Sequence, residues 1–211
     1  MAINPQRSAA YQGGPMSETE YLQLDQSTSD ARYEYIDGVA KLMAGGTIEA
    51  DEIGFNVRTA LKQHFLNGPC KVFGPDVQVL VGVKGNGHNH YYYPDCTISC
   101  NVADRSRGNK LIRSPHTAIE VLSPGTEKDD RGTKLRNYQI LPTMWEVVFI
   151  SQFAPHVEVY HREEDSTGPI WKHTIFGPGQ AVILPSMDIE LSMDEIYEGI
   201  NFDEPLPEEM A

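Results

Sequence analysis

The chain has 211 residues, enough for one domain with a buried core, and its 40% hydrophobic and 22% charged residues are ordinary for a globular protein. No apolar run approaches the roughly 20 residues of a membrane-spanning helix, and the polar start of the chain shows no signal peptide. We therefore expect a cytoplasmic protein with no membrane contact. Cys70, Cys96 and Cys100 are an odd number in a chain too long to need disulfides, so reduced thiols are expected.

The net charge is −13, which opposes binding to nucleic acid if it is spread uniformly. It is not uniform, because residues 105–136 hold eight cations and four acids, a net of +4 against −17 for the remainder. The cations are Arg105, Arg107, Lys110, Arg113, Lys128, Arg131, Lys134 and Arg136. Such a segment either contacts phosphate groups or simply faces water.

The chain order of the predicted elements indicates a mixed β-sheet flanked by α-helices. Residues 1–15 are expected to be disordered, 16–202 to form a single domain, and 203–211 to be an acidic tail. Apolar spacing predicts helices at the capping box 17–20, over about 53–65 and 129–141, and at the capping box 192–195. Alternating or continuous apolar segments predict strands over 33–36, 39–43, 77–81, 95–100, 117–122, 145–150, 157–161 and 172–176, with loops over 82–90 and 101–115.

Glu120 is the one charged residue in the strand 117–122, whose neighbours are apolar on both sides. A strand that is apolar on both faces lies inside a sheet. An isolated charge in that position needs a cationic partner or a hydrogen-bonded proton. The alternative to a functional role is a structural ion pair with a nearby arginine.

Asp95 follows Pro94 at the beginning of the preceding predicted strand, a place that suits proline. Taken alone, Asp95 is also explained as a turn acid. An aspartate at the start of one strand and a glutamate within the next can converge on one point. Two carboxylates at one point suit Mg²⁺ or Mn²⁺, so Asp95 and Glu120 predict a divalent metal site.

Lys134 lies at the edge of the helix face formed by Leu135, Tyr138 and Leu141. Its stem can follow apolar surface while its amine reaches a pocket. Phosphodiester hydrolysis needs such a charge near the phosphate. An i,i+4 salt bridge to Asp130 is the alternative.

Several segments together resemble one family, the Uma-type restriction endonucleases of the PD-(D/E)XK nuclease superfamily. The resemblance covers about residues 17–200, and its most distinctive part is a Glu-Val-Leu-Ser-Pro run followed by an Asp-x-x-x-Lys helix. The segments that carry it are Tyr33–Gly38, Pro94–Asp95, Glu120–Thr126, Asp130–Tyr138 and Trp145–Val148.

The resemblance implies a restriction-endonuclease-like α/β (α+β) fold, a central mixed sheet flanked by helices. It also implies magnesium-dependent cleavage of DNA, with Asp95 and Glu120 as metal ligands and the carbonyl of Val121 as a further ligand. Lys134 would stabilise charge, and Glu34 would be an additional carboxylate near the metal, unless it is merely an exposed strand residue. Homodimerisation is expected because cutting two strands often uses two sites.

Two positions depart from the family pattern. The superfamily motif has a lysine two residues after the glutamate, where this chain has Leu122, and many relatives carry a histidine where this chain has Ala50–Asp51. A lysine at 122 would share a strand face with Glu120 and point at the metal. Two alternatives therefore stand: a catalytically impaired nuclease-like fold that binds nucleic acid or protein, and an acidic interaction module whose Glu120 pairs with an arginine.

Overall fold

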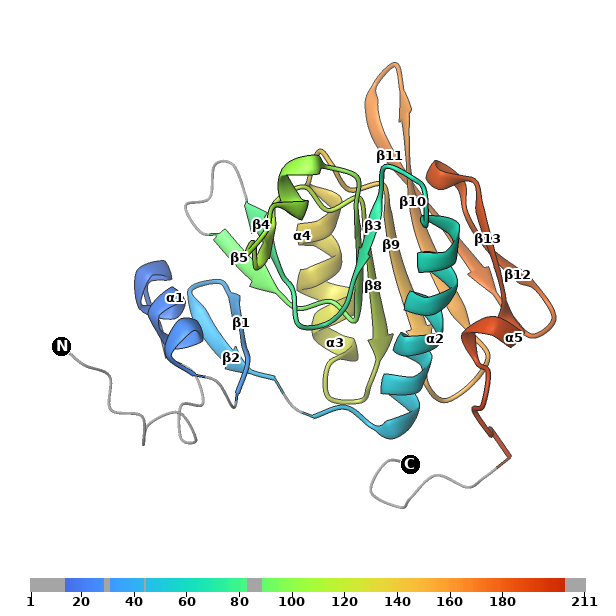
Figure 1. Cartoon of the computed structure of the whole chain (residues 1–211), viewed down its shortest axis with the longest axis horizontal. Coiled ribbons are helices and arrows are strands. Elements are labelled where there is room, and N and C mark those ends of the chain that lie inside the picture. The colour runs from blue at the N-terminus through green and yellow to red at the C-terminus, as the bar shows by residue number, and fades with distance from the viewer. Residues whose placement is uncertain (1–13, 29–30, 44, 83–88, 204–211) are drawn as a thin grey trace.

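The largest sheet in the computed structural model, which describes residues 14–28, 31–43, 45–82 and 89–203, has six strands (Figure 1). β8 (Thr117–Leu122) and β9 (Glu146–Ser151) run parallel and the other neighbouring pairs run antiparallel, so the sheet is mixed, as predicted. In spatial order the strands are β11 (Gly168–Phe176), β10 (Val157–Asp165), β9 (Glu146–Ser151), β8 (Thr117–Leu122), β6 (Cys96–Ser99) and β3 (Lys71–Phe73).

Seven further strands form two smaller sheets, so the expectation of one central sheet was incomplete. The five-stranded sheet contains, in order, β2 (Val39–Leu42), β1 (Tyr33–Ile36), β5 (Asn89–Tyr92), β4 (Gln78–Gly82) and β7 (Leu111–Ile112). The third sheet pairs β12 (Ala181–Leu184) with β13 (Ile189–Ser192). β5 and β7 fall partly or wholly in predicted loops, because each is short and is held by neighbouring strands rather than by an alternating pattern of its own. β5 pairs with β1 and β4, and β7 pairs with β4.

The predicted helices are present, with one local difference. The helices are α1 (Glu18–Ser27), α2 (Ile48–His64), α3 (Glu127–Asp129), the π-helical segment η3 (Asp130–Lys134), α4 (Leu135–Gln139), α5 (Met193–Ile196) and the short 3₁₀ turns η2 (Val102–Arg105) and η4 (Pro185–Met187). Both predicted capping boxes are formed, at the starts of α1 and α5. The helix predicted over 129–141 begins at Glu127 and contains the π-helical segment, a feature found often at functional sites.

The six-stranded sheet separates two apolar layers. On one side α2 packs Ile53, Val57 and Leu61 against the sheet, together with β12, β13 and α5. α4 lies on the opposite side of this sheet from α2 (Figure 1). There Tyr138 and Leu141, from α4 and just beyond it, pack with residues of the five-stranded sheet. Every residue of β8 is buried, which confirms it as an interior strand.

The hairpin turn at Asp37–Gly38 is confirmed, since both residues have positive φ, at 50° and 81°, as a tight two-residue turn requires. The predicted termini largely lie outside the described residues, as does most of the loop over 82–90. No helix in the described part of the chain is long and apolar enough to cross a membrane.

The expectation of reduced thiols was wrong for two of the three cysteines. Cys70 and Cys100 form a disulfide bond, and Cys96 is free and buried. Lys71 and Ser99 are paired across β3 and β6, so the next residues outward are brought face to face. This pairing could not be read from sequence spacing. Because disulfides are rare in cytosolic proteins, the cysteines no longer support a cytoplasmic location.

Candidate functional site

The register of β6 against β8 brings Asp95 and Glu120 together. Cys96 lies opposite Ile119, so the next residues outward, Asp95 and Glu120, face each other at the end of the ladder. Side-chain alternation directs Glu120 to the side of the sheet covered by α4, where the residue is 3% exposed. The sequence therefore placed these two acids correctly, one just before a strand and one within its neighbour.

Asp95 is held from both sides by neighbouring backbone and side-chain groups. Its Oδ2 accepts a hydrogen bond of 2.7 Å from the backbone N–H of Val121, and its carbonyl accepts one of 3.1 Å from Arg58 of α2. Burial raises the pKa of Asp95 to about 6, although the Val121 N–H favours the charged form. Asp95 thus titrates close to neutrality.

Lys134 contacts Glu120 and joins two further carboxylates to the site. Its Nζ lies 2.9 Å from Oε1 of Glu34, 2.9 Å from Oδ1 of Asp130 and 3.5 Å from Oε1 of Glu120. Glu34 is only 8% exposed, so its interpretation as an exposed strand residue was wrong. The i,i+4 pair with Asp130 is real, but it accompanies the contact with Glu120 rather than replacing it. No arginine among the described residues forms an ion pair with Glu120, so that alternative is also wrong.

The site holds more negative than positive charge. Glu34, Asp95, Glu120 and Asp130 surround one ammonium group, with Arg58 nearby. Burial, together with the like charges of neighbouring acids, raises the pKa of Glu120 well above its usual range. Burial opposes the charged form of Lys134, but three carboxylates outweigh it and hold its pKa above the usual value. The ammonium therefore stays charged, and the surplus of negative charge around it favours the binding of another cation.

Tyr138 is a site residue that sequence reasoning assigned only to packing. Its hydroxyl donates a hydrogen bond of 2.8 Å to Oε1 of Glu120, and the side chain is fully buried. Asp130 was considered only as a salt-bridge partner. The spacing of Asp130, Lys134 and Tyr138 at i, i+4 and i+8 is the signal that would have grouped them on one helix face.

The donor set fits a hard divalent cation. Within the described residues no three His, Cys, Asp or Glu side chains are arranged as a complete metal site. Mg²⁺ is, however, commonly bound by one or two carboxylates and several waters. Neither Oδ1 of Asp95 nor Oε2 of Glu120 receives a hydrogen bond from any residue that the structure describes. The N–H of Val121 points toward Asp95, and in an extended ladder the carbonyl of the same residue faces the same edge.

Comparison with models of protein families assigns the chain to one family. Residues 19–194 match the model of the Uma2 family, described as "Putative restriction endonuclease". The chain belongs to the Uma2 family. Relatives include two uncharacterized proteins of Synechocystis sp.: slr1290, 28% identical over 89% of this chain and 94% of its own, and sll1609, 23% identical over 71% and 82%.

A solved structure supports the fold of this Uma2 member. A crystal structure titled as a putative nuclease belonging to DUF820, from Anabaena variabilis, aligns with a TM-score of 0.69 at 18% identity. The alignment covers 87% of this chain and 98% of that one. The restriction-endonuclease-like fold class is therefore confirmed.

The departures from the Uma2 pattern have clear structural places. Leu122 is 4% exposed and packs in the apolar layer beneath α4, on the same strand face as Glu120. It brings no charge to the site, and Lys134 reaches Glu120 from the helix instead. Asp51 lies in the first turn of α2 and is exposed, so it does not replace a site histidine.

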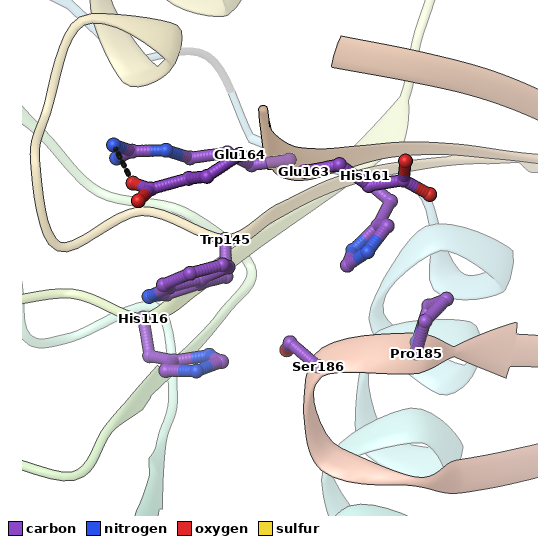
Figure 2. Close-up of a pocket in the computed structure, with 8 residues that line it drawn as sticks. His116, Trp145, His161, Glu163, Glu164, Pro185 and Ser186 are labelled. Carbon is purple, nitrogen blue, oxygen red and sulfur yellow. Dashed lines mark hydrogen bonds and ion pairs between the residues drawn. The ribbon is translucent and has the colours of Figure 1, made fainter. Parts of the chain in front are cut away.

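The described residues also contain a pocket of about 480 Å³ (Figure 2). His116, Trp145, His161 and Ser186 surround it, and none of its lining residues belongs to the carboxylate site. Beside it, the fully buried carboxylate of Glu146 accepts hydrogen bonds from Ser186 and Thr117. The pocket and the carboxylate site are thus separate features.

The basic segment over 105–136 divides into internal and exposed cations. Lys134 is buried in the carboxylate site, and Arg105 and Arg131 are half-buried. Arg131 bonds to Glu127 and Glu158 at 2.6 Å each. Five others are exposed to solvent, namely Arg107, Lys110, Arg113, Lys128 and Arg136. These five remain available for contacts with phosphate groups.

Proposed function

We propose that this protein is a metal-dependent endonuclease that hydrolyses phosphodiester bonds in DNA. The observation that carries the proposal is the meeting of Asp95 and Glu120 across β6 and β8, each with an oxygen that receives no hydrogen bond from the described residues, beside Lys134. Bound Mg²⁺ or Mn²⁺ would polarise the scissile phosphate and lower the pKa of a water molecule. The predicted ligands are Asp95, Glu120 and the carbonyl of Val121.

The chain's own groups prepare the site for this chemistry. The N–H of Val121 fixes one oxygen of Asp95, and the hydroxyl of Tyr138 fixes one oxygen of Glu120. Each acid thereby keeps its second oxygen directed away from those bonds. Lys134 supplies a fixed positive charge for the phosphate as negative charge develops in the transition state. Glu34 and Asp130 hold that ammonium in place.

A cleavage assay tests the proposal. Plasmid, linear duplex and single-stranded DNA are incubated with the protein and Mg²⁺ or Mn²⁺, with EDTA and Glu120→Gln as controls. Cleavage by the wild type that EDTA abolishes is expected. If the wild type cuts no substrate better than Glu120→Gln, the catalytic proposal is refuted. A product series on circular DNA separates endonuclease from exonuclease action.

The alternative is a nuclease-like fold that binds nucleic acid or protein without cutting. It is favoured by the apolar Leu122 and by the three acids that engage Lys134. Calorimetric titration with Mg²⁺ distinguishes the two, since absence of binding at millimolar metal supports the non-catalytic function. The DNA substrate, the cytoplasmic location and a homodimer that cuts both strands stay predictions.

A further inference from the structure

The ammonium group of Lys134 lies among the carboxylates of the site. Three elements direct carboxylates at it, since Glu34 comes from β1, Glu120 from β8 and Asp130 from η3. The lysine is 5% exposed, and its Nζ also lies 5.6 Å from the centre of the Tyr92 ring. A buried cation with this many acidic partners has the surroundings of a bound ion.

The three contacts are unequal. Nζ lies 2.9 Å from the oxygens of Glu34 and Asp130 but 3.5 Å from Oε1 of Glu120. That oxygen of Glu120 also accepts the hydroxyl of Tyr138 at 2.8 Å. Glu120 can therefore release the ammonium and keep Tyr138, while the ammonium keeps its two shorter contacts.

Lys134 and a divalent cation draw on the same negative charge. Glu120 is shared directly, since it contacts the ammonium and is also half of the predicted metal pair with Asp95. The two cations would be close neighbours in a buried site, where charges are poorly screened and repel one another. Without a metal, the buried acids would lack a counter-ion if Lys134 were absent, which is strongly unfavourable.

We propose that Lys134 is a built-in counter-ion that competes with the divalent cation for Glu120. The inference rests on the proposed metal site at Asp95 and Glu120. Lys134 neutralises Glu120 in the metal-free protein and withdraws toward Glu34 and Asp130 when a divalent cation binds. The same lysine therefore lowers the affinity of the site for metal and supplies charge for the reaction. Because Lys134 lowers this affinity, the site requires a higher metal concentration to fill than it would without the lysine.

Calorimetric titration with MgCl₂ or MnCl₂ alone, without DNA, tests the competition. The variants are Lys134→Gln, which removes the charge, and Lys134→Arg, which retains it. Lys128→Gln is the matched control, because Lys128 is an exposed lysine close by in the same helical segment. We expect Lys134→Gln to bind metal at least about tenfold more tightly than the wild type although it cleaves less. Lys134→Arg and Lys128→Gln should stay within about twofold of the wild type.

The outcomes separate this inference from the proposed function. If the wild type binds metal and Lys134→Gln binds it equally or less tightly, the competition is refuted while the metal site stands. If neither protein binds metal, the proposed metal site fails and the competition with it. Binding by Lys134→Gln alone supports the competition in its strongest form.

A measurement on the wild type covers the case in which Lys134→Gln does not fold. NMR of ¹⁵N-lysine-labelled protein follows the ammonium resonance of Lys134, whose burial slows proton exchange with water. Addition of saturating Mg²⁺ should shift this resonance more than that of any exposed lysine. A resonance that stays in place at metal saturation overturns the proposal.

Discussion

Two buried glutamates on adjacent strands, Glu120 of β8 and Glu146 of β9, bond their carboxylates in opposite ways. Glu146 is fully buried, and both of its oxygens are occupied by neutral donors. Oε1 accepts the N–H of Ser186 at 2.8 Å, and Oε2 accepts the hydroxyls of Ser186 at 2.5 Å and of Thr117 at 3.1 Å. His116 and His161 lie beside it, at 3.8 and 3.3 Å.

Glu120 has the contrasting arrangement. Its Oε1 receives a hydroxyl and an ammonium, and its Oε2 receives no hydrogen bond from the described residues. The side chains around Glu120 also include three other acids, namely Asp130, Asp95 and Glu34. The comparison teaches that burial of a glutamate does not identify a functional site. The distinguishing features are an unfilled oxygen and a surplus of negative charge around it.

The largest expected effect separates the two glutamates by activity. Glu120→Gln should lower cleavage by at least about 100-fold, because it removes the charge on a predicted metal ligand. Its fold should survive, since Lys134 keeps Glu34 and Asp130. Glu146→Gln, measured in the same plasmid assay at a temperature where both variants are folded, should cleave like the wild type. Equal loss in both variants would mean that the two acids do not differ in role.

The next effect distinguishes Glu146 from Glu120 by its contribution to the stability of the fold. Glu146→Gln should lower the free energy of unfolding by about 2 kcal/mol, because the charged acceptor of three hydrogen bonds is replaced by a neutral amide whose NH₂ cannot accept them. Urea denaturation followed by circular dichroism measures the change, with Glu190→Gln on an exposed position as control. A stability equal to that of the wild type would contradict the structural role of Glu146.

The sequence revealed Glu120 and not Glu146 for a physical reason. Glu120 interrupts a continuous apolar run, so its charge is conspicuous, and a proline marks Asp95 at the start of its strand. Glu146 stands at the first residue of its strand, where an acid is unremarkable, and its donors come from Thr117 and from Ser186, 40 residues downstream. Only the folded chain brings such distant groups together.

In the rest of the fold, too, features set by adjacent residues could be predicted from the sequence, and features set by contacts between remote segments could not. Caps, the Asp37–Gly38 turn and the interior strand were predictable, because each depends on a few adjacent residues. The division into three sheets and the Cys70–Cys100 disulfide were not, because they depend on pairing between remote segments. In the site, Asp95, Glu120 and Lys134 were predicted to converge, while the contribution of Tyr138 required the structure.

The smallest effect concerns pH. Burial raises the pKa of Asp95 from 3.8 to about 6, so in the metal-free folded protein this carboxyl holds its proton more tightly than in the unfolded chain. Its contribution therefore destabilises the metal-free fold as pH rises from about 4 to 6. A divalent cation must displace that proton below pH about 6, and its affinity should fall about tenfold between pH 7 and pH 5.

Titration calorimetry with MgCl₂ at these two pH values, in buffers of different ionisation enthalpy, measures both the affinity and the protons released. Glu146→Gln is the control, because its carboxylate lies outside the site and the same pH dependence should persist. An affinity that is constant between pH 7 and pH 5 would mean that Asp95 is already ionised or does not bind the metal. Proton release at pH 5 that vanishes at pH 7 would tie metal binding to ionisation of the Asp95 carboxyl.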